Sequence, residues 1–138
     1  MFTLMLERIE KLFKRNVMYT IFVYWISTLL LVLCLAIGAV LDLGQASSVL
    51  ESLSHLGYPK FLAPILGVWK VLGSIAILIP GFQRLKEWAY AGVFFDLSGA
   101  FLSHVIVGDE FRELVPIIAI LGFALISWAT RPITRRLQ

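Results

Sequence analysis

One uncharged stretch decides the fold: VMYTIFVYWISTLLLVLCLAIGAVL, which occupies residues 17–41. A helix that crosses a bilayer needs about 20 predominantly apolar residues, within a range of roughly 17–25. This stretch reaches that length, and it exceeds the apolar core of roughly 7–15 residues that a cleaved signal peptide carries. No small residue stands directly before Cys34 to form a lipoprotein cleavage site. We therefore expect this segment to be a retained membrane-spanning helix.

Three further apolar runs follow the first one along the chain. The chain as a whole is 59% hydrophobic and 15% charged, whereas a soluble domain usually has about 45–50% apolar and about 25% charged residues. The sequence therefore predicts an all-α fold, an integral membrane four-helix bundle without a separate soluble domain. Its spans are expected at about residues 17–41, 61–79, 88–107 and 114–130.

The longest connection, residues 42–60, contains a pattern that predicts one short helix. Ser48 and Glu51 have the spacing of a capping box, in which a serine caps the helix and the third helical residue reaches back to it. Leucines follow at helical spacing, and Gly57 supplies a stop. We expect a helix at about residues 49–56 that covers the outer mouth of the bundle; the alternative is a plain connector.

Lysine and arginine are distributed unequally between the two sides of the predicted membrane. Nine of them lie before the first run, between the second and third runs, or after the fourth run, and only Lys60 and Arg112 lie on the other side. An excess of basic residues marks the cytoplasmic side. We therefore expect a multi-pass protein of the bacterial inner (cytoplasmic) membrane with both termini inside. The net charge of +3 is then a topology signal, and we expect no nucleic-acid partner.

The first 16 residues have an amphipathic pattern. Apolar residues recur at helical spacing from Phe2 to Phe13, and charged residues occupy most of the opposite face. Such a helix lies in the membrane interface with its apolar side among the lipids. We therefore expect an amphipathic helix at 1–16 on the inner leaflet that runs into the first span, a four-span domain at 17–131 and a basic tail at 132–138. The alternative role for the N-terminal helix is docking of a cytosolic partner.

Two charged residues lie near the centres of predicted spans, Lys70 in the second run and Asp96 in the third. Each lies about 13 residues from the turn between these runs, so at 1.5 Å per residue both are roughly 19–20 Å from it. An isolated charge at this depth costs about 2.5–3.5 kcal/mol, which predicts that the two residues form a buried ion pair. The pair either fixes the register of the two helices or forms the polar floor of a ligand pocket or proton-coupled site.

Other polar residues are predicted to face the bundle interior. The first span carries Tyr24 and Thr28 on a stripe that leads to Asp42. Hydroxyl-bearing and small residues on such faces allow close helix packing and satisfy buried polar groups. Because histidine titrates near neutral pH, His104 makes a proton-accessible vestibule a candidate site at the outer end. The alternative is that His104 is an ordinary hydrogen-bonded residue of its helix. The vestibule would contain Asp42, Ser103, His104 and Asp109.

At the inner interface, Lys86 and Glu87 begin the third run, and the Lys86 ammonium is expected to extend toward water. The lone cysteine, Cys34, excludes an intrachain disulfide and a thiolate zinc site. A zinc site made from His55 and His104 lacks further ligands. We therefore expect no catalytic residue, no metal and no evident cofactor, and we do not expect the isolated chain to be an enzyme.

Several short motifs resemble the DoxX-like family of membrane proteins. The resemblance covers about Val17 to Arg131, most of the chain, and excludes the N-terminal helix. The motifs that carry it are Leu56-Gly57-Tyr58-Pro59, Ile65-Leu66-Gly67-Val68-Trp69-Lys70-Val71-Leu72-Gly73, Pro80-Gly81, Leu85-Lys86-Glu87-Trp88-Ala89-Tyr90-Ala91-Gly92, Asp96-Leu97-Ser98-Gly99-Ala100 and Ser103-His104.

The resemblance implies a small four-span membrane protein of bacteria or archaea whose activity is undetermined. The family takes its name from a subunit of a thiosulfate:quinone oxidoreductase, and some members are associated with redox or detoxification complexes. It marks Lys70, Glu87, Asp96 and His104 as characteristic positions, without proving a catalytic role. We expect a redox-linked membrane subunit that binds a quinone-like or other amphipathic small molecule in the bundle, with a membrane or cytosolic redox partner. The alternatives are a non-catalytic scaffold that anchors a partner protein and, with less support, a homodimeric small-molecule transporter.

Overall fold

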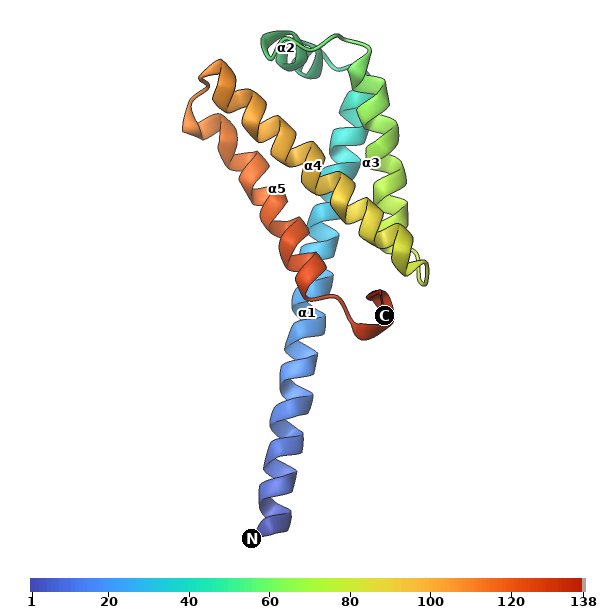
Figure 1. Ribbon diagram of the computed structural model, residues 1–138, viewed down its shortest axis with the longest axis vertical. Helices are drawn as coiled ribbons and strands as arrows, with labels where there is room; N and C mark the ends of the chain where they lie inside the picture. Colours follow the sequence, from blue (N-terminus) through green and yellow to red (C-terminus); the bar gives the residue numbers. More distant parts are fainter. Residues whose placement is uncertain (138) are drawn as a thin grey trace.

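A computed structural model describes residues 1–137, and within them every regular element is a helix (Figure 1). The predicted all-α fold class is confirmed. The elements are α1 (Phe2–Leu43), α2 (Ser47–His55), α3 (Leu62–Leu78), α4 (Gln83–Val107), α5 (Phe111–Ala129) and the short 3-10 helix η1 (Ile133–Arg135). We call the end that carries α2 and residues 108–110 the outer end, and the end that carries residues 79–82 and the C-terminal tail the inner end, after the predicted orientation.

The first helix is much longer than a membrane span. It has 42 residues, about 63 Å at 1.5 Å per residue, and it joins the predicted N-terminal helix and the predicted first span without a break. Its N-terminal part projects beyond the inner end of the bundle (Figure 1). The helix expected at 1–16 is therefore continuous with the first span, and its position on the inner leaflet stays a prediction.

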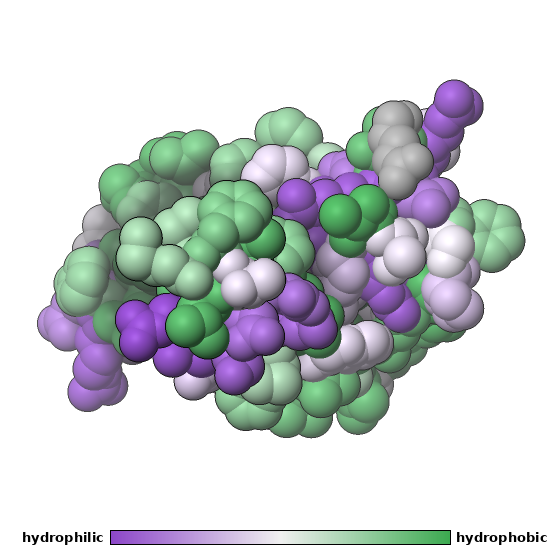
Figure 2. All heavy atoms as spheres, turned by 90° about the horizontal axis from the view of Figure 1, so that it is seen from below, coloured by the Kyte–Doolittle hydropathy of each residue, from purple (hydrophilic) through white to green (hydrophobic). Residues whose placement is uncertain are grey.

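Length and composition allow three of the described helices to cross a membrane: α1, α4 and α5. The remaining long helix, α3, has 17 apolar-rich residues, which is the lower end of the usual range of spanning helices. Many large apolar side chains are exposed on all of these helices. Figure 2, which views the molecule from its inner end, shows apolar residues around much of the outline. Such a surface suits contact with lipid.

The bundle is built from two helix pairs. Helix α1 packs against α3 and α5, and α4 packs against α5 and α3 (Figure 1). On α1 the buried residues recur three or four positions apart, which is the spacing of one helix face. The central core combines residues from four helices: Leu31, Leu35, Ile77, Tyr90, Val93, Leu97 and Ala124.

The sequence explains where the helices of the α3–α4 hairpin end. Pro80 cannot continue the hydrogen-bond ladder of α3, and Gly81 adopts a φ of 73°, which glycine reaches without steric cost. The short connection brings α4 back alongside α3. Between α1 and α3, helix α2 confirms the helix predicted at 49–56. The predicted capping box is wrong, because α2 begins one residue before Ser48 and no side chain caps it.

Candidate functional site

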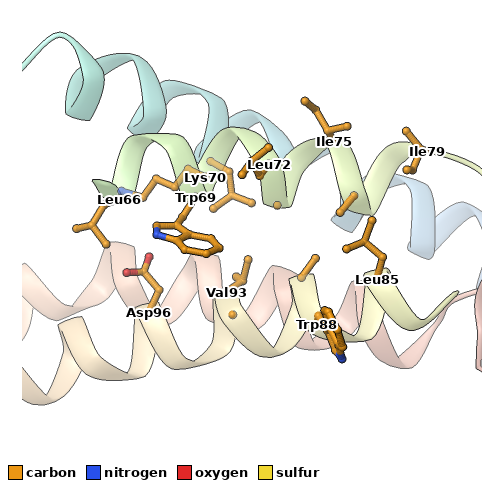
Figure 3. Close-up of a pocket in the computed structure, with 15 residues that line it drawn as sticks. Leu66, Trp69, Lys70, Leu72, Ile75, Ile79, Leu85, Trp88, Val93 and Asp96 are labelled. Atoms are coloured by element: carbon orange, nitrogen blue, oxygen red, sulfur yellow. The ribbon is translucent and has the colours of Figure 1, made fainter. Parts of the chain in front are cut away.

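A lateral groove between α3 and α4 contains the midplane charges that the sequence singled out (Figure 3). Its cavity has a volume of about 510 Å³, and it is lined mainly by apolar side chains of these two helices, with Leu35 of α1 at its base. Trp69 and Trp88 line it and remain 67% and 76% exposed, respectively. The groove is therefore open toward the surface that lipid would cover.

Lys70 forms the polar end of the groove with a partner that differs from the predicted one. Its Nζ lies 2.5 Å from Asp42 Oδ2, and no ion pair joins Lys70 to Asp96 among the described residues. The prediction of a direct Lys70–Asp96 pair is therefore wrong. The reason is that α1 extends to Leu43, so that Asp42, which the sequence suggested was the start of a loop, lies on the last turn of the helix that faces α3.

Gly38 makes room for this ion pair. A Cβ atom at residue 38 would lie 3.4 Å from both Cδ and Nζ of Lys70, so the lysine stem passes directly over the glycine on its way to Asp42. Asp42 is buried, and its charge is matched by the ammonium. A buried ion pair of this kind holds α1 and α3 in one register.

Asp96 projects from α4 into the same groove, across from Lys70 and Trp69 (Figure 3). Within residues 1–137 its carboxyl group has no hydrogen-bond or ion-pair partner of its own, and the Lys70 ammonium is bonded to Asp42. The groove thus carries one matched pair of charges and one further carboxyl group at its polar end. The sequence singled out Asp96 together with Lys70, and both line this groove; the predicted ion-pair partner is what it misassigned.

At the inner end, Lys86 does not extend toward water, contrary to expectation. The side chain is only 1% exposed, and its Nζ donates hydrogen bonds to the backbone carbonyls of Ala76 (2.9 Å), Ile77 (3.1 Å) and Ile79. These carbonyls belong to the end of α3, where the last turn of a helix has no amide partners of its own. Arg135 from the C-terminal tail donates to the Ile77 and Leu78 carbonyls. Two cations from distant segments therefore cap α3.

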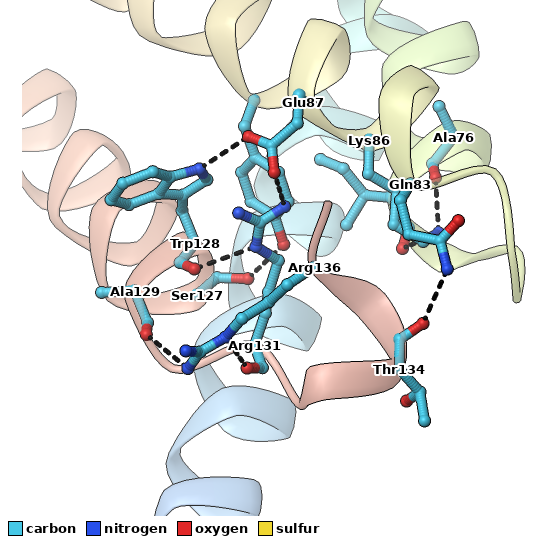
Figure 4. A network of polar contacts seen from close by, with 12 residues as sticks. Ala76, Gln83, Lys86, Glu87, Ser127, Trp128, Ala129, Arg131, Thr134 and Arg136 are labelled. Carbon is cyan, nitrogen blue, oxygen red and sulfur yellow. Dashed lines mark hydrogen bonds and ion pairs between the residues drawn. The ribbon is translucent and has the colours of Figure 1, made fainter. Parts of the chain in front are cut away.

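Glu87 lies beside this cap in a second polar cluster (Figure 4). Its carboxylate forms an ion pair with Arg131, whose Nη1 lies 2.8 Å away but does not have the geometry of a hydrogen bond. The carboxylate also accepts a 3.0 Å hydrogen bond from Trp128 Nε1. The buried Arg131 guanidinium also lies over the Tyr90 and Trp128 rings. Glu87 therefore has structural partners that join α4 to the end of α5.

Tyr24 and Thr28 are both buried, as predicted, and lie inward of Asp42 on α1. The Thr28 hydroxyl lies 2.6 Å from that of Ser127, and the Tyr90 hydroxyl lies 2.7 Å from Ser127 as well. The Tyr24 hydroxyl accepts a hydrogen bond from Arg135. These residues form a polar connection among α1, α4 and α5 that is separate from the groove.

The outer end holds a cluster that the sequence predicted only in part. Asp109 accepts hydrogen bonds on both carboxylate oxygens, from His55 Nε2 at 2.7 Å and from His104 Nδ1 at 2.6 Å. Ser103 bonds with the Tyr58 hydroxyl at 2.8 Å. Asp42 does not belong to the predicted vestibule, because it pairs with Lys70. Hydrogen bonds from His55 and His104 lower the pKa of Asp109, because they favour the charged carboxylate.

Comparison with known proteins adds one result to this geometry. The model of the DoxX-like family matches residues 26–129, from the middle of α1 to the end of α5. No curated protein and no solved structure matches the chain. The matched region includes the groove, the outer cluster and Lys86 of the α3 cap, and it leaves out Arg135 and the projecting part of α1.

Proposed function

Because the chain belongs to the DoxX-like family of membrane proteins, we propose that it binds an amphipathic, quinone-like small molecule in the α3–α4 groove and works as a redox-linked membrane subunit. The observation that carries the proposal is the uneven chemistry of the groove. Charged groups gather at one end, near Lys70 and Asp96, and the remaining walls are apolar. A ligand with a polar head and an apolar tail matches both parts.

The polar end can hold a head group that carries oxygen atoms. A lysine ammonium has three N–H donors, and Lys70 gives one of them to Asp42. The remaining donors and the Asp96 carboxyl group are available to bind a ligand carbonyl or hydroxyl. Toward the inner end, Leu72, Ile75 and Leu85 offer an apolar path for a tail.

The size and the opening of the groove also support a ligand from the bilayer. Small-molecule pockets usually have volumes of about 300–1,000 Å³, and this cavity of about 510 Å³ lies within that range. The exposed Trp69 and Trp88 stand at its lipid-facing side. A hydrophobic molecule dissolved in the membrane can therefore enter sideways, without passing through water.

Quinone binding can be measured by tryptophan quenching in lipid nanodiscs with decylubiquinone as the probe. We expect saturable quenching in the wild type, and an affinity for decylubiquinone that is at least tenfold weaker in Asp96→Asn and in Lys70→Gln. Glu51→Gln on α2 is a matched control, since this exposed carboxylate lies outside the groove. Equal affinity in wild type and in a folded Asp96→Asn variant would refute the proposal. Trp69→Phe and Trp88→Phe identify which part of the signal comes from the groove.

The projecting part of α1 favours a second candidate function, a scaffold that anchors a partner protein. Its apolar side chains, such as Phe2 and Phe13, remain exposed and are not covered by the bundle. Deleting residues 2–14 should then release the partner while the bundle keeps its thermal stability. Co-purification that is unchanged by the deletion would exclude this role.

We also propose that the protein lies in the inner membrane with both termini in the cytoplasm, as its basic residues suggest. The test uses a Cys34→Ser background with one new cysteine, at Ser52 or at Thr134. A membrane-impermeant maleimide added to intact cells should label the Ser52→Cys variant and leave the Thr134→Cys variant unlabelled. The opposite labelling would mean that the C-terminus lies outside and would refute the proposed topology.

A further inference from the structure

The outer cluster joins the two segments that flank the groove. His55 ends α2 and Tyr58 lies between α2 and α3, whereas Ser103, His104 and Asp109 lie at the end of α4 or just after it. Their contacts, His55 to Asp109 and Tyr58 to Ser103, connect parts of the chain that are more than 40 residues apart. Helix α2 itself has one buried side chain, that of Leu53. These polar contacts therefore provide much of what holds this segment to the α4–α5 hairpin.

The walls of the groove are thus fastened at both ends. At the inner end the short turn at 79–82 links α3 covalently to α4. At the outer end no covalent turn links the α2–α3 segment to α4, and the hydrogen bonds of Asp109 and Tyr58 cross between them. A change in these outer contacts can therefore alter the separation of the walls near Asp96.

We propose that His55, Asp109 and His104 form a pH-responsive latch at the outer end, which holds α2 against the α4–α5 turn and sets the opening of the groove. The latch itself stands on the geometry of the cluster. Its effect on ligand access rests on the proposed function of the groove. The sequence alone suggested a vestibule around His104, without His55 or Tyr58 in it.

The chemistry of the cluster gives the pH response. A carboxylate only accepts hydrogen bonds, so each histidine must present an N–H to Asp109 even when it is neutral. Histidine changes its charge between about pH 5 and 8, and protonation of either ring turns its contact with the carboxylate into an ion pair. Both histidines lie in the last turn of their helices, where the helix dipole favours a cation. The latch is therefore strongest in mild acid.

Stronger acid removes the anion on which the latch depends. Because the pKa of Asp109 is lowered in the folded protein, its contribution is present above the ordinary pKa of an aspartate and is lost as the pH falls through the lowered value. Two protonated histidines would then face an uncharged carboxyl group. The latch is thus strengthened when the histidines are charged and is lost when Asp109 is protonated.

The other charged groups near the cluster lie on the same three segments. They do not act as its hydrogen-bond partners in the described structure, and Asp42 and Lys70 are paired with each other. They are Glu51 on α2, Lys60 before α3, and Glu110, Arg112 and Glu113 at the start of α5.

Hydrogen exchange of the full-length protein in nanodiscs tests the latch. We expect the backbone amides of α2 to be about two- to fivefold better protected at about pH 5.5 than at about pH 8, after correction for the intrinsic exchange rate at each pH, as suits a partly exposed ion pair. Asp109→Asn keeps the shape and removes the charge, so it should abolish this ratio. His55→Gln should reduce it, and its exposed side chain makes a folding defect improbable. Tyr58→Phe is the matched control, since it removes a neighbouring contact, with Ser103, and leaves the two histidines and Asp109 in place, so it should leave the ratio unchanged.

A wild-type ratio close to one, or an unchanged ratio in both Asp109→Asn and His55→Gln, would overturn the latch. Decylubiquinone affinity measured at the same two pH values separates the two proposals. A pH-dependent α2 without quinone binding at either pH would refute the groove and leave the latch standing. Quinone binding together with pH-independent protection of α2 would refute the latch and leave the groove standing.

Discussion

Replacing Lys86 with methionine tests the cap on α3, which depends on one buried ammonium. The Nζ donates to the carbonyls of Ala76, Ile77 and Ile79, and Arg135 also donates to Ile77. Methionine fills a similar volume and adapts its shape easily, so the main change is the loss of the donor. Two carbonyls, those of Ala76 and Ile79, lose the only side-chain donor that serves them among residues 1–137.

The expected loss of stability follows from these two carbonyls. Leaving a buried acceptor without a partner costs about 1–3 kcal/mol. Removing the ammonium also removes the free-energy cost of burying a charge, which offsets part of the loss. We therefore expect Lys86→Met to lower the free energy of unfolding by about 2–4 kcal/mol.

Reversible unfolding in mixed detergent micelles, followed by circular dichroism, measures this difference. Lys60→Met is a suitable control, because Lys60 is an exposed lysine at the other end of the bundle, and we expect its unfolding free energy to stay within about 0.5 kcal/mol of wild type. A Lys86→Met protein as stable as the Lys60→Met protein would show that the ammonium does not cap α3. Lys86→Arg should keep part of the stability, since a guanidinium also donates to carbonyls.

Three further predictions concern other parts of the molecule. Gly38→Val should displace the Lys70 side chain from Asp42 and lower the free energy of unfolding by about 1–3 kcal/mol. In a Lys70→Met background the same substitution should cost much less, and an equal cost in both backgrounds would contradict the packing argument. Ser127→Ala removes a hydroxyl that two others contact, and its unfolding free energy should fall by about 1–2 kcal/mol, whereas an unchanged value would mean that the hydroxyls find other partners. Because the pKa of Asp109 is lowered, acidification well below the ordinary aspartate pKa of about 3.9 should protonate it and increase hydrogen exchange in α2 while α5 stays protected; equal changes in both helices would point to global unfolding instead.

Apolar run lengths and turn residues made most of the fold predictable from the sequence. Pro80-Gly81 marks the α3–α4 turn because proline and glycine act locally on the backbone. The partner of Lys70 was not predictable in the same way. It depends on α1 continuing two residues past its apolar run, to Leu43, and helix ends are the least certain feature of a sequence pattern.

The environment of Lys86 shows a second limit. Its position at a predicted interface suggested a side chain that reaches water, and the sequence alone does not reveal that the open carbonyls of α3 lie nearer. The contact between His55 and Asp109 shows the same limit, because 54 residues separate the two in the sequence and no spacing rule connects them. Pairings between elements are set by tertiary packing. An unexplained polar residue beside an expected helix end was the signal that could have pointed to the contacts of Lys86 and His55.

The unbroken length of α1 has a mechanical consequence. Residues that project beyond the inner end and the buried Asp42 near the outer end belong to one stiff rod about 63 Å long. If the rod pivots about its midpoint, a tilt of about 5° moves its outer tip by about 2–3 Å, as much as the separation of Asp42 from Lys70. A force on the projecting N-terminal part of α1 would therefore shift Asp42 relative to Lys70 at the polar end of the groove, so that the helix acts as a lever across the membrane. Thr20→Pro should uncouple the two ends, so that a bulky protein fused at the N-terminus no longer alters quinone affinity; an effect of the fusion that survives this break would exclude the lever.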